Sequence, residues 1–365
     1  MGRKEKEWWV FPGFEVHLVV EGLELPVNIA VDRRDESQIL FYVTELFGKV
    51  KAIDSSYRTH TYADRLLNYK PKPEFPGQGE SGVTGICVDP ETGDLLVTML
   101  YKDRDEFKGK MVRMNSGDGL KMDSMEDIIN NIPSTTRSHQ IQAPSIGFDK
   151  KLYLNVGDGG AWEDAPQDDG DLRGKVLRME LDGSIPEDNP VKGSYVFAKG
   201  FRNPFGAAWR KIDKSLYVTV NGPAVDDVLA KVGPGSDHGW YGDMRKDALF
   251  WWHFTQAPTA LDFMQDGQFH KRFDGELFVA LFGDSYRKGI SIKGKKIVKM
   301  RINETSTGIS SYDEFVTYIG RGPSSPCGLA FGKEGLYFTD LHGGNIYLVK
   351  PRDDYDFNKE MEHVF

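Results

Sequence analysis

The chain has 365 residues, of which 39% are hydrophobic and 28% charged, a composition typical of a globular protein with a sizeable core. The net charge of −9 argues against a nucleic-acid partner, because phosphate binding requires a basic surface. No apolar run is long enough to cross a bilayer, and Pro12 and Glu15 interrupt the apolar stretch that a signal peptide needs. The chain is therefore expected to be cytoplasmic, or a mature form whose signal has been removed.

One pattern of apolar strands recurs along the chain. Each copy has a short apolar strand, often after a proline, then a polar turn and a second apolar strand that ends in Gly or Asp. The copies start near residues 26, 83, 143, 203, 257 and 325. Examples are "VTGICVDPETGDLLVTMLY" from Val83 and "APSIGFDKKLYLNVGDGG" from Ala143, and a third strand such as "KIVKMRI" from Lys296 often follows.

This repeat predicts the fold. A period of roughly 50 to 70 residues, with strands and almost no helical periodicity, predicts an all-β, six-bladed β-propeller of four-stranded antiparallel blades. Residues 1–365 then form a single propeller domain, and a strand near residues 14–20 closes the last blade. The alternative is a β-sandwich with accidental similarity between its segments. Cys87 and Cys327 lie in apolar strands, which favours two buried thiols over a long-range disulfide.

Polar residues are expected to converge at one end of this ring. Neighbouring strands of a blade are antiparallel, so the residues before each first strand and after each second strand share one face. Before first strands come Glu80, His139, Arg202 with Asn203, and Arg321. After second strands come Asp158, Asn221, Gly222, Pro223, Asp284, Arg287, Lys288, Asp340 and His342. Several cations together with a histidine predict a site for an anionic ligand and a proton acceptor.

Each of these residues also has a structural interpretation. His139 stands at a strand entrance, where a histidine more often serves as a hydrogen-bonding group than as a base. Asp and Asn in tight turns usually bind their own backbone. No Cys and His residues have the spacing of a zinc site, and no serine sits in a nucleophile elbow. The functional interpretation therefore depends on the coincidence of these residues on one face.

Several segments carry more specific motifs, which are strongest from His139 to Gly242. They include "GKVLRMELDGSIPEDNP" from Gly174, "KGFRNPFGAAW" from Lys199, "NGPAVDD" from Asn221 and "SDHGWYG" from Ser236. On these segments the chain resembles the soluble glucose dehydrogenase and sorbosone (aldose sugar) dehydrogenase family. Members of that family are six-bladed propellers that use pyrroloquinoline quinone (PQQ) and calcium.

The resemblance implies oxidation of an aldose sugar at its anomeric hydroxyl, with a hydride passing to the quinone. It makes His139 the base and places Arg202 over the reactive quinone carbonyl. Asp227 matches an acidic residue near the substrate and the base, and Asp158 matches an aspartate close to the catalytic site. It also implies a set of cofactor-binding residues, Arg202, Asn203, Arg287, Lys288 and Glu80. The backbone carbonyls of Gly222 and Pro223 would hold Ca²⁺, a hard cation that prefers oxygen ligands. Trp162 and Phe205 are candidates for flat surfaces against the cofactor.

The chain also departs from the family pattern. Phe205 stands where the family has a polar cofactor contact, and the last blade keeps only Arg321 of a pair of arginines. A non-catalytic propeller that binds sugar or protein is therefore the alternative, and a calcium-dependent lactonase is a third hypothesis. The resemblance implies a periplasmic or secreted protein, with a cytoplasmic one as the other option. It leaves open the sugar, the electron acceptor and the oligomeric state.

Overall fold

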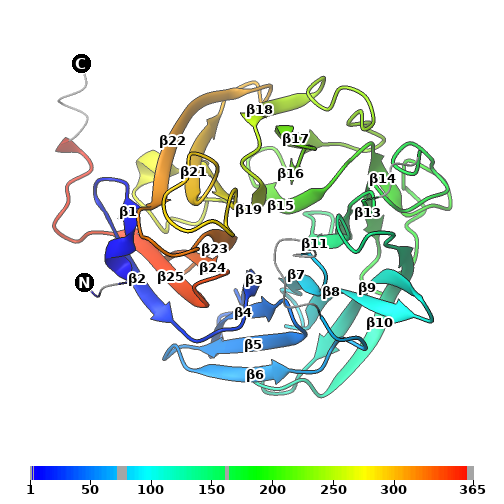
Figure 1. Ribbon diagram of the computed structural model, residues 1–365, viewed down its shortest axis with the longest axis horizontal. Helices are drawn as coiled ribbons and strands as arrows, with labels where there is room; N and C mark the ends of the chain where they lie inside the picture. Colours follow the sequence, from blue (N-terminus) through cyan, green and yellow to red (C-terminus); the bar gives the residue numbers. More distant parts are fainter. Residues whose placement is uncertain (1, 3, 72–79, 161–163, 360–365) are drawn as a thin grey trace.

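The computed structural model describes residues 2, 4–71, 80–160 and 164–359, and these form an all-β propeller. Six antiparallel sheets stand as blades around a central channel (Figure 1). The helical elements of the described residues are two 3₁₀ turns, η1 (Glu5–Glu7) and η2 (Lys271–Phe273). The six-bladed propeller predicted from the repeat is therefore confirmed.

Each blade runs from an innermost strand at the channel to an outer strand at the rim. Blade 1 contains β3 (Pro26–Val31), β4 (Ile39–Glu45), β5 (Lys49–Asp54) and β6 (Thr59–Ala63). Blade 2 contains β7 (Val83–Val88), β8 (Leu95–Asp103), β9 (Glu106–Asn115) and β10 (Ser124–Pro133). Blade 3 contains β11 (Ile141–Ile146), β12 (Leu152–Val156), β13 (Lys175–Met179) and β14 (Val196–Lys199).

The second half of the chain repeats this order. Blade 4 contains β15 (Pro204–Arg210), β16 (Ser215–Val220), β17 (Val225–Val232) and β18 (Ala248–Phe254). Blade 5 contains β19 (Pro258–Phe263), β20 (Leu277–Leu281), β21 (Lys296–Ile302) and β22 (Ile309–Tyr318). Blade 6 contains β23 (Pro326–Gly332), β24 (Gly335–Asp340), β25 (Asn345–Pro351) and the N-terminal strand β2 (Phe14–Val20).

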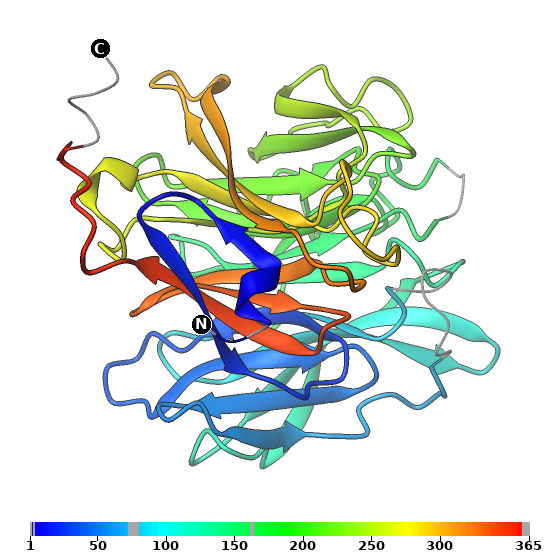
Figure 2. The ribbon, with the colours of Figure 1, turned by 60° about the vertical axis from the view of Figure 1, so that its left-hand side comes forward.

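The N-terminal segment completes two blades. Strand β2 pairs antiparallel with β25, so strands from both ends of the chain lie side by side in blade 6 (Figure 2). Strand β1 (Trp8–Val10) adds a fifth strand to blade 5 by pairing with β22. Trp8 holds it there, because its buried ring packs edge-on against Tyr318, Phe338 and Tyr347. The sequence pattern did not predict this fifth strand.

The hydrophobic core is divided among the contacts between blades. A cluster of buried apolar residues lies between each pair of neighbouring blades around the ring. Both faces of the inner strands are therefore covered, and β20 is buried along its whole length. Cys87 and Cys327 are free thiols rather than a disulfide. Burial raises the pKa of both thiols, to about 12 for Cys327, which disfavours the thiolate form at neutral pH.

The innermost strands are irregular at the end of the channel where they begin, which we call the mouth. All six change register with their neighbours close to that end. In four blades a threonine of the second strand accepts a backbone N–H released there, in the pairs Asn28–Thr44, Gly85–Thr98, Gly206–Thr219 and Gly328–Thr339. Such bulges turn the chain and redirect side chains. They direct the segments that precede the inner strands toward the mouth.

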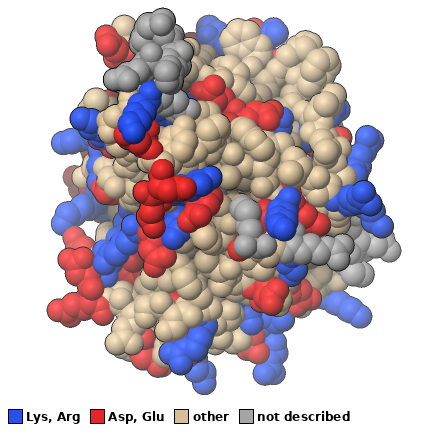
Figure 3. All heavy atoms as spheres, turned by 90° about the vertical axis from the view of Figure 1, so that its left-hand side faces the viewer, with Lys and Arg blue, Asp and Glu red and all other residues tan. Residues whose placement is uncertain are grey.

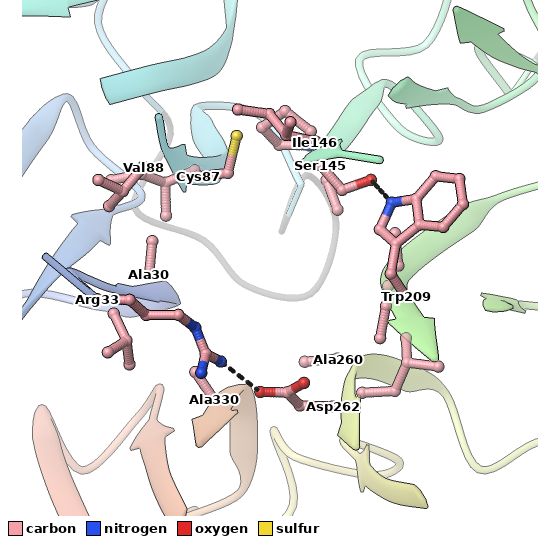
Figure 4. A pocket seen from close by; sticks show the side chains of 18 of the residues that line it. Ala30, Arg33, Cys87, Val88, Ser145, Ile146, Trp209, Ala260, Asp262 and Ala330 are labelled. Atoms are coloured by element: carbon pink, nitrogen blue, oxygen red, sulfur yellow. Dashed lines mark hydrogen bonds and ion pairs between the residues drawn. The ribbon is translucent and has the colours of Figure 1, made fainter. Parts of the chain in front are cut away.

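The other half of the channel holds a cavity of about 500 Å³. Its wall is largely apolar, with Ala30, Val88 and Ala260 among the residues that line it (Figure 4). Two polar contacts lie across the wall: Arg33 pairs with Asp262 at 3.7 Å, and Trp209 Nε1 donates to Ser145 Oγ at 3.2 Å. None of the site residues predicted from the sequence lines this cavity.

The outer wall of the ring carries charges of both signs. On the side shown in Figure 3, basic and acidic side chains are interspersed, with no field of a single sign. Among the residues that the structure describes, no helix has the length and apolar character needed to cross a membrane.

Candidate active site

Most of the predicted site residues form one hydrogen-bonded network at the mouth. Most of them come from the connections that precede the first strands or follow the second strands of blades 2, 3 and 4, as the antiparallel geometry predicts. Asp227 instead lies in β17, the third strand of blade 4. The network joins Glu80, His139, Asp158, Arg202, Asn203, Gly222 and Asp227.

His139 and Asp158 form a close pair at the centre of this network. Nδ1 of His139 lies 2.7 Å from Oδ1 of Asp158, and the two side chains are only 16% and 4% exposed. Asp158 also accepts hydrogen bonds from Trp240 Nε1 and from the backbone N–H of Gly160, both at 2.8 Å. Because a carboxylate only accepts hydrogen bonds, the imidazole proton lies on Nδ1. Nε2 of His139 is then the nitrogen that can accept a proton.

A glycine allows this pair to form. A Cβ atom at residue 157 would collide with the carbonyl oxygen of His139, so only glycine fits beside that backbone. His139 itself has a φ of 49°, in the left-handed region. Its carbonyl oxygen accepts the N–H of Gly159 at 3.0 Å, which brings Asp158 next to the imidazole.

Glu80 connects the pair to the neighbouring blades. Its Oε2 accepts the backbone N–H of His139 at 2.8 Å and Nε2 of Gln142 at 3.2 Å. Its Oε1 accepts Nδ2 of Asn203 at 3.1 Å. A single carboxylate thus fixes groups from blades 3 and 4 and sets the backbone position of His139.

Replacing Glu80 with Ala is expected to destabilise the protein by about 1–3 kcal/mol, because three partly buried donors lose their acceptor. Denaturant unfolding measures the change. Glu91→Ala is the matched control, since Glu91 pairs with Lys150 on the exposed surface, and its loss should cost about 1 kcal/mol or less. Equal effects of the two substitutions would contradict the role of Glu80.

Arg202 places a positive charge beside the pair. Its Nη1 donates to the carbonyl oxygens of Asn221 at 3.0 Å and Gly222 at 2.8 Å. The guanidinium also lies 5.7 Å from the centre of the Trp240 ring, in a cation–π arrangement. Burial lowers its pKa, against the opposing effect of the Asp158 and Glu80 carboxylates, yet an arginine stays charged.

Asp227 shapes the turn that presents these carbonyls. It is fully buried, and burial raises its pKa despite the hydrogen bonds that it accepts. Oδ1 accepts the N–H of Gly222 at 2.8 Å, and Oδ2 accepts the N–H groups of Gln256 at 2.6 Å and Ala257 at 2.8 Å. Its carboxylate is thus engaged by the surrounding backbone. Pro223, the second predicted metal ligand, is exposed in the same turn.

The basic residues of blades 5 and 6 lie apart from this network. Arg287 and Lys288 are exposed in the connection between β20 and β21, and Arg287 is 3.8 Å from Asp284. Arg321 is also exposed.

The remaining predicted residues lie in different surroundings. Phe205 is almost fully buried in β15. Asp340 is fully buried and accepts backbone N–H groups, while Nε2 of His342 lies 3.3 Å from Ser285 Oγ. Trp162 lies outside the described residues.

Buried polar atoms without partners mark the same mouth. The side-chain amide of Gln140, Oε1 of Gln142, Oδ1 of Asn203 and Oδ1 of Asn221 have no hydrogen-bond partner within the described part of the chain. Buried polar groups are nearly always satisfied, so this cluster indicates a polar ligand or water. Gln140 and Gln142 were not predicted as site residues, although they lie one and three residues after His139 in the sequence.

His238 makes the stability of this region depend on pH. Its ring is stacked 4.4 Å from Phe201, and burial lowers its pKa from 6.5 to about 4. The unfolded chain therefore binds more protons than the folded protein between these two pH values, and the free energy of unfolding decreases as the pH falls through that window.

His238→Gln should lower the number of protons taken up on unfolding in this pH window by about one, and so flatten the slope of the free energy of unfolding against pH. His253→Gln, at an exposed position of β18, should keep the wild-type slope. Chemical denaturation at a series of pH values measures both, and an unchanged slope in His238→Gln would contradict the assignment.

Comparisons with known proteins identify a family. A family model described as glucose/sorbosone dehydrogenase matches residues 23–310. Quinoprotein glucose dehydrogenase B of Acinetobacter calcoaceticus is 34% identical over 199 residues, covering 48% of this chain and 39% of that protein. The chain thus matches well under half the length of that relative. Aldose sugar dehydrogenase YliI of Escherichia coli is 21% identical over 370 residues, covering 90% of this chain and 93% of that protein.

Solved structures share the fold. The apo form of the soluble aldose sugar dehydrogenase from Escherichia coli has a TM-score of 0.72 at 19% identity, over 93% of this chain and all of that one (100%). The PQQ-bound aldose sugar dehydrogenase of Streptomyces coelicolor has a TM-score of 0.68 at 20% identity, over 94% of this chain and 100% of that one. Since the family model covers residues 23–310 of 365, the chain belongs to the glucose/sorbosone dehydrogenase family.

Proposed function

We propose that this chain oxidises an aldose sugar at its anomeric hydroxyl, with PQQ as cofactor and calcium as metal. The relatives named above are sugar dehydrogenases, oxidoreductases that act on CH–OH groups, and one was solved with PQQ bound. The observation that carries the proposal is the His139–Asp158 pair beside Arg202 at one mouth. The family resemblance also leads us to propose a periplasmic or secreted location.

The mouth fits a planar, anionic quinone and a hard cation. Arg202 supplies a partly buried positive charge, and Asn203 and the two glutamines supply amide groups with unused hydrogen-bonding capacity. The turn at Gly222 already directs carbonyl oxygens at a cation, which here is the Arg202 guanidinium. Oxygen donors of this kind suit Ca²⁺. No cluster of three or more His, Cys, Asp or Glu side chains suited to a metal ion exists among the described residues.

Each residue then has a defined task. When bound, PQQ supplies the two-electron oxidising chemistry that side chains lack. Nε2 of His139 takes the proton of the sugar hydroxyl, and Asp158 stabilises the imidazolium that forms. Arg202 stabilises negative charge that develops next to it.

The remaining residues bind or position. Asp227 holds the turn at Gly222, whose carbonyl oxygen would bind calcium together with that of Pro223. Asn203 and Glu80, which are hydrogen-bonded to each other, are assigned to cofactor binding. Arg287 and Lys288 are assigned to the cofactor carboxylates, because the connection that carries them follows β20 at the same mouth.

Titrating the metal-free protein with PQQ, with and without calcium, tests the proposal by absorbance. An aldose panel and a dye acceptor are added afterwards. We expect saturable, calcium-dependent quinone binding and sugar-driven dye reduction. Absence of quinone binding would overturn the proposal. Sugar binding without dye reduction would instead support a non-catalytic propeller module, for which the burial of Phe205 is the favouring observation.

A further inference from the structure

Trp240 contacts two groups of opposite charge at the mouth. Its Nε1 donates to Oδ2 of Asp158 at 2.8 Å, and the guanidinium of Arg202 lies 5.7 Å from the centre of its ring. Trp240 belongs to the segment "SDHGWYG", to which the proposed function assigns no task. One side chain thus touches both the partner of the proposed base and the proposed stabilising cation.

The indole is held in a fixed position. Trp240 is 6% exposed. Its backbone N–H donates to the carbonyl oxygen of Gly200 at 3.0 Å, and its own carbonyl oxygen accepts Nε2 of Gln167 at 2.8 Å. Gly200 follows β14 and Gln167 lies between β12 and β13, so Trp240 is anchored to blade 3 at two points. The direction of the indole N–H is therefore set by the surrounding structure.

The two carboxylate oxygens of Asp158 have different partners. Oδ1 is 2.7 Å from Nδ1 of His139 and accepts the N–H of Gly160 at 2.8 Å. Oδ2 accepts from Trp240 and from no other group in the described part of the chain. Asp158 is 3% exposed, so without the indole Oδ2 would be a buried, charged oxygen that lacks a donor. The carboxylate would then turn toward another donor.

Arg202 is the cationic neighbour of this carboxylate. The backbone N–H of Asp158 donates to the carbonyl oxygen of Arg202 at 2.8 Å, which brings the two residues side by side. Burial lowers the pKa of Arg202, and Asp158 is the carboxylate that opposes this effect most strongly. The two side chains nevertheless form no ion pair: among the described residues, Nη1 of Arg202 donates to the carbonyl oxygens of Asn221 and Gly222. Opposite charges attract strongly in a partly buried site, so their separation requires an explanation.

An ion pair between Asp158 and Arg202 would disable both side chains. Arginine and carboxylate bind each other in a planar arrangement with two hydrogen bonds, which would draw the carboxylate away from His139. The imidazole would no longer be fixed with its proton on Nδ1, and Nε2 would lose its role as the acceptor. The guanidinium charge would be neutralised at the place where negative charge develops.

We propose that Trp240 is a positioning residue that keeps Asp158 and Arg202 apart, by giving the carboxylate a neutral donor and the guanidinium an aromatic face. The carboxylate then stays on His139, and the cation stays available to the reacting groups. The inference rests on the proposed function, because the tasks of His139 and Arg202 belong to it. The arrangement of the side chains does not depend on turnover and is measurable in the protein without cofactor.

The position of the imidazole proton reports whether Asp158 remains on His139. ¹⁵N NMR of the histidine-labelled, cofactor-free protein distinguishes a protonated from an unprotonated ring nitrogen, and His139→Gln identifies the signals. At alkaline pH, we expect the proton of wild-type His139 on Nδ1. In Trp240→Phe, which keeps an aromatic ring and removes the N–H, we expect most molecules to carry the proton on Nε2, the form that free histidine favours.

A second substitution separates ion pairing from a simple loss of order. In Trp240→Phe combined with Arg202→Met, the carboxylate has no guanidinium to turn to, so the proton of His139 should return to Nδ1. Arg202→Met alone should keep the wild-type pattern. Trp209→Phe is the matched control, because Nε1 of Trp209 donates to Ser145 Oγ at 3.2 Å in the other half of the channel (Figure 4). It should not move the proton.

Two results would contradict this role. A wild-type proton position in Trp240→Phe would overturn the proposal. A proton that moves in Trp240→Phe and is not restored by adding Arg202→Met would mean that Trp240 orients the carboxylate without keeping it from Arg202, which overturns the separating role. If Trp240→Phe does not fold, benzothienylalanine at position 240 preserves the two-ring shape and replaces only the N–H with sulfur, and the same outcomes apply.

Kinetics of the same variants test the proposed function separately. With PQQ and calcium, kcat for dye reduction by Trp240→Phe should fall about tenfold while KM stays close to wild type, since the lost interactions act in the transition state. The expected proton positions in a protein that does not reduce the dye would reject only the function. Dye reduction with an unchanged proton position in Trp240→Phe would reject only the role of Trp240.

Discussion

Replacing His139 with Gln lowers turnover by roughly 10²-fold or more, the usual contribution of a general base, while PQQ binding stays close to wild type. Glutamine can still donate to Asp158 Oδ1, which now lies 2.7 Å from Nδ1, but it supplies no group that takes a proton at neutral pH. The pocket should therefore keep its shape and lose its base. Dye reduction at saturating sugar measures turnover, and a quinone titration of the same preparation measures binding.

A matched control makes this result specific. His253→Gln, at an exposed position on β18, should leave turnover unchanged. Wild-type turnover in His139→Gln would mean that the residue only anchors the strand entrance, where its backbone N–H donates to Glu80 and its carbonyl accepts from Gly159.

The fold was predictable because its signals are local. Each blade has two apolar strands joined by a polar turn, and a propeller is the arrangement that covers both faces of six such sheets. Strand β1 was missed because a strand of three residues is too short to show an alternation of apolar and polar residues. Its position depends instead on the packing of Trp8 against β22 and blade 6. The register shifts at the mouth were missed as well, although a threonine recurs in the second strand of four blades.

The site was predictable only in part. Chain order alone assigns His139, Asp158 and Arg202 to one face, because strand direction fixes which connections meet there. It does not reveal that Trp240 donates to Asp158, or that Gln256 donates to Asp227, since these partners come from distant connections. The sequence also could not show that Asp227 is fully enclosed, which turns a residue predicted near the substrate into one that we assign to positioning.

Arg202→Met is expected to change two measurements in opposite directions. Catalysis should fall about 10²- to 10³-fold, because a fixed cation next to developing negative charge is lost. Calcium affinity of the PQQ-free protein should rise, because the guanidinium that donates to the Gly222 carbonyl oxygen at 2.8 Å occupies a ligand that calcium would need. Like charges at a shared ligand oppose each other, so removing one favours the other.

Calorimetric titration with calcium and dye-reduction assays measure the two effects. Arg352→Met is the matched control, because Arg352 is exposed beyond the end of β25 and pairs with Asp354 at 2.7 Å. It should change neither measurement. Weaker calcium binding in Arg202→Met would mean that Arg202 stabilises the turn for the metal rather than competing with it. Unchanged calcium binding would remove the Gly222 carbonyl from the metal site, and the calcium ligands would then have to be sought elsewhere around the mouth.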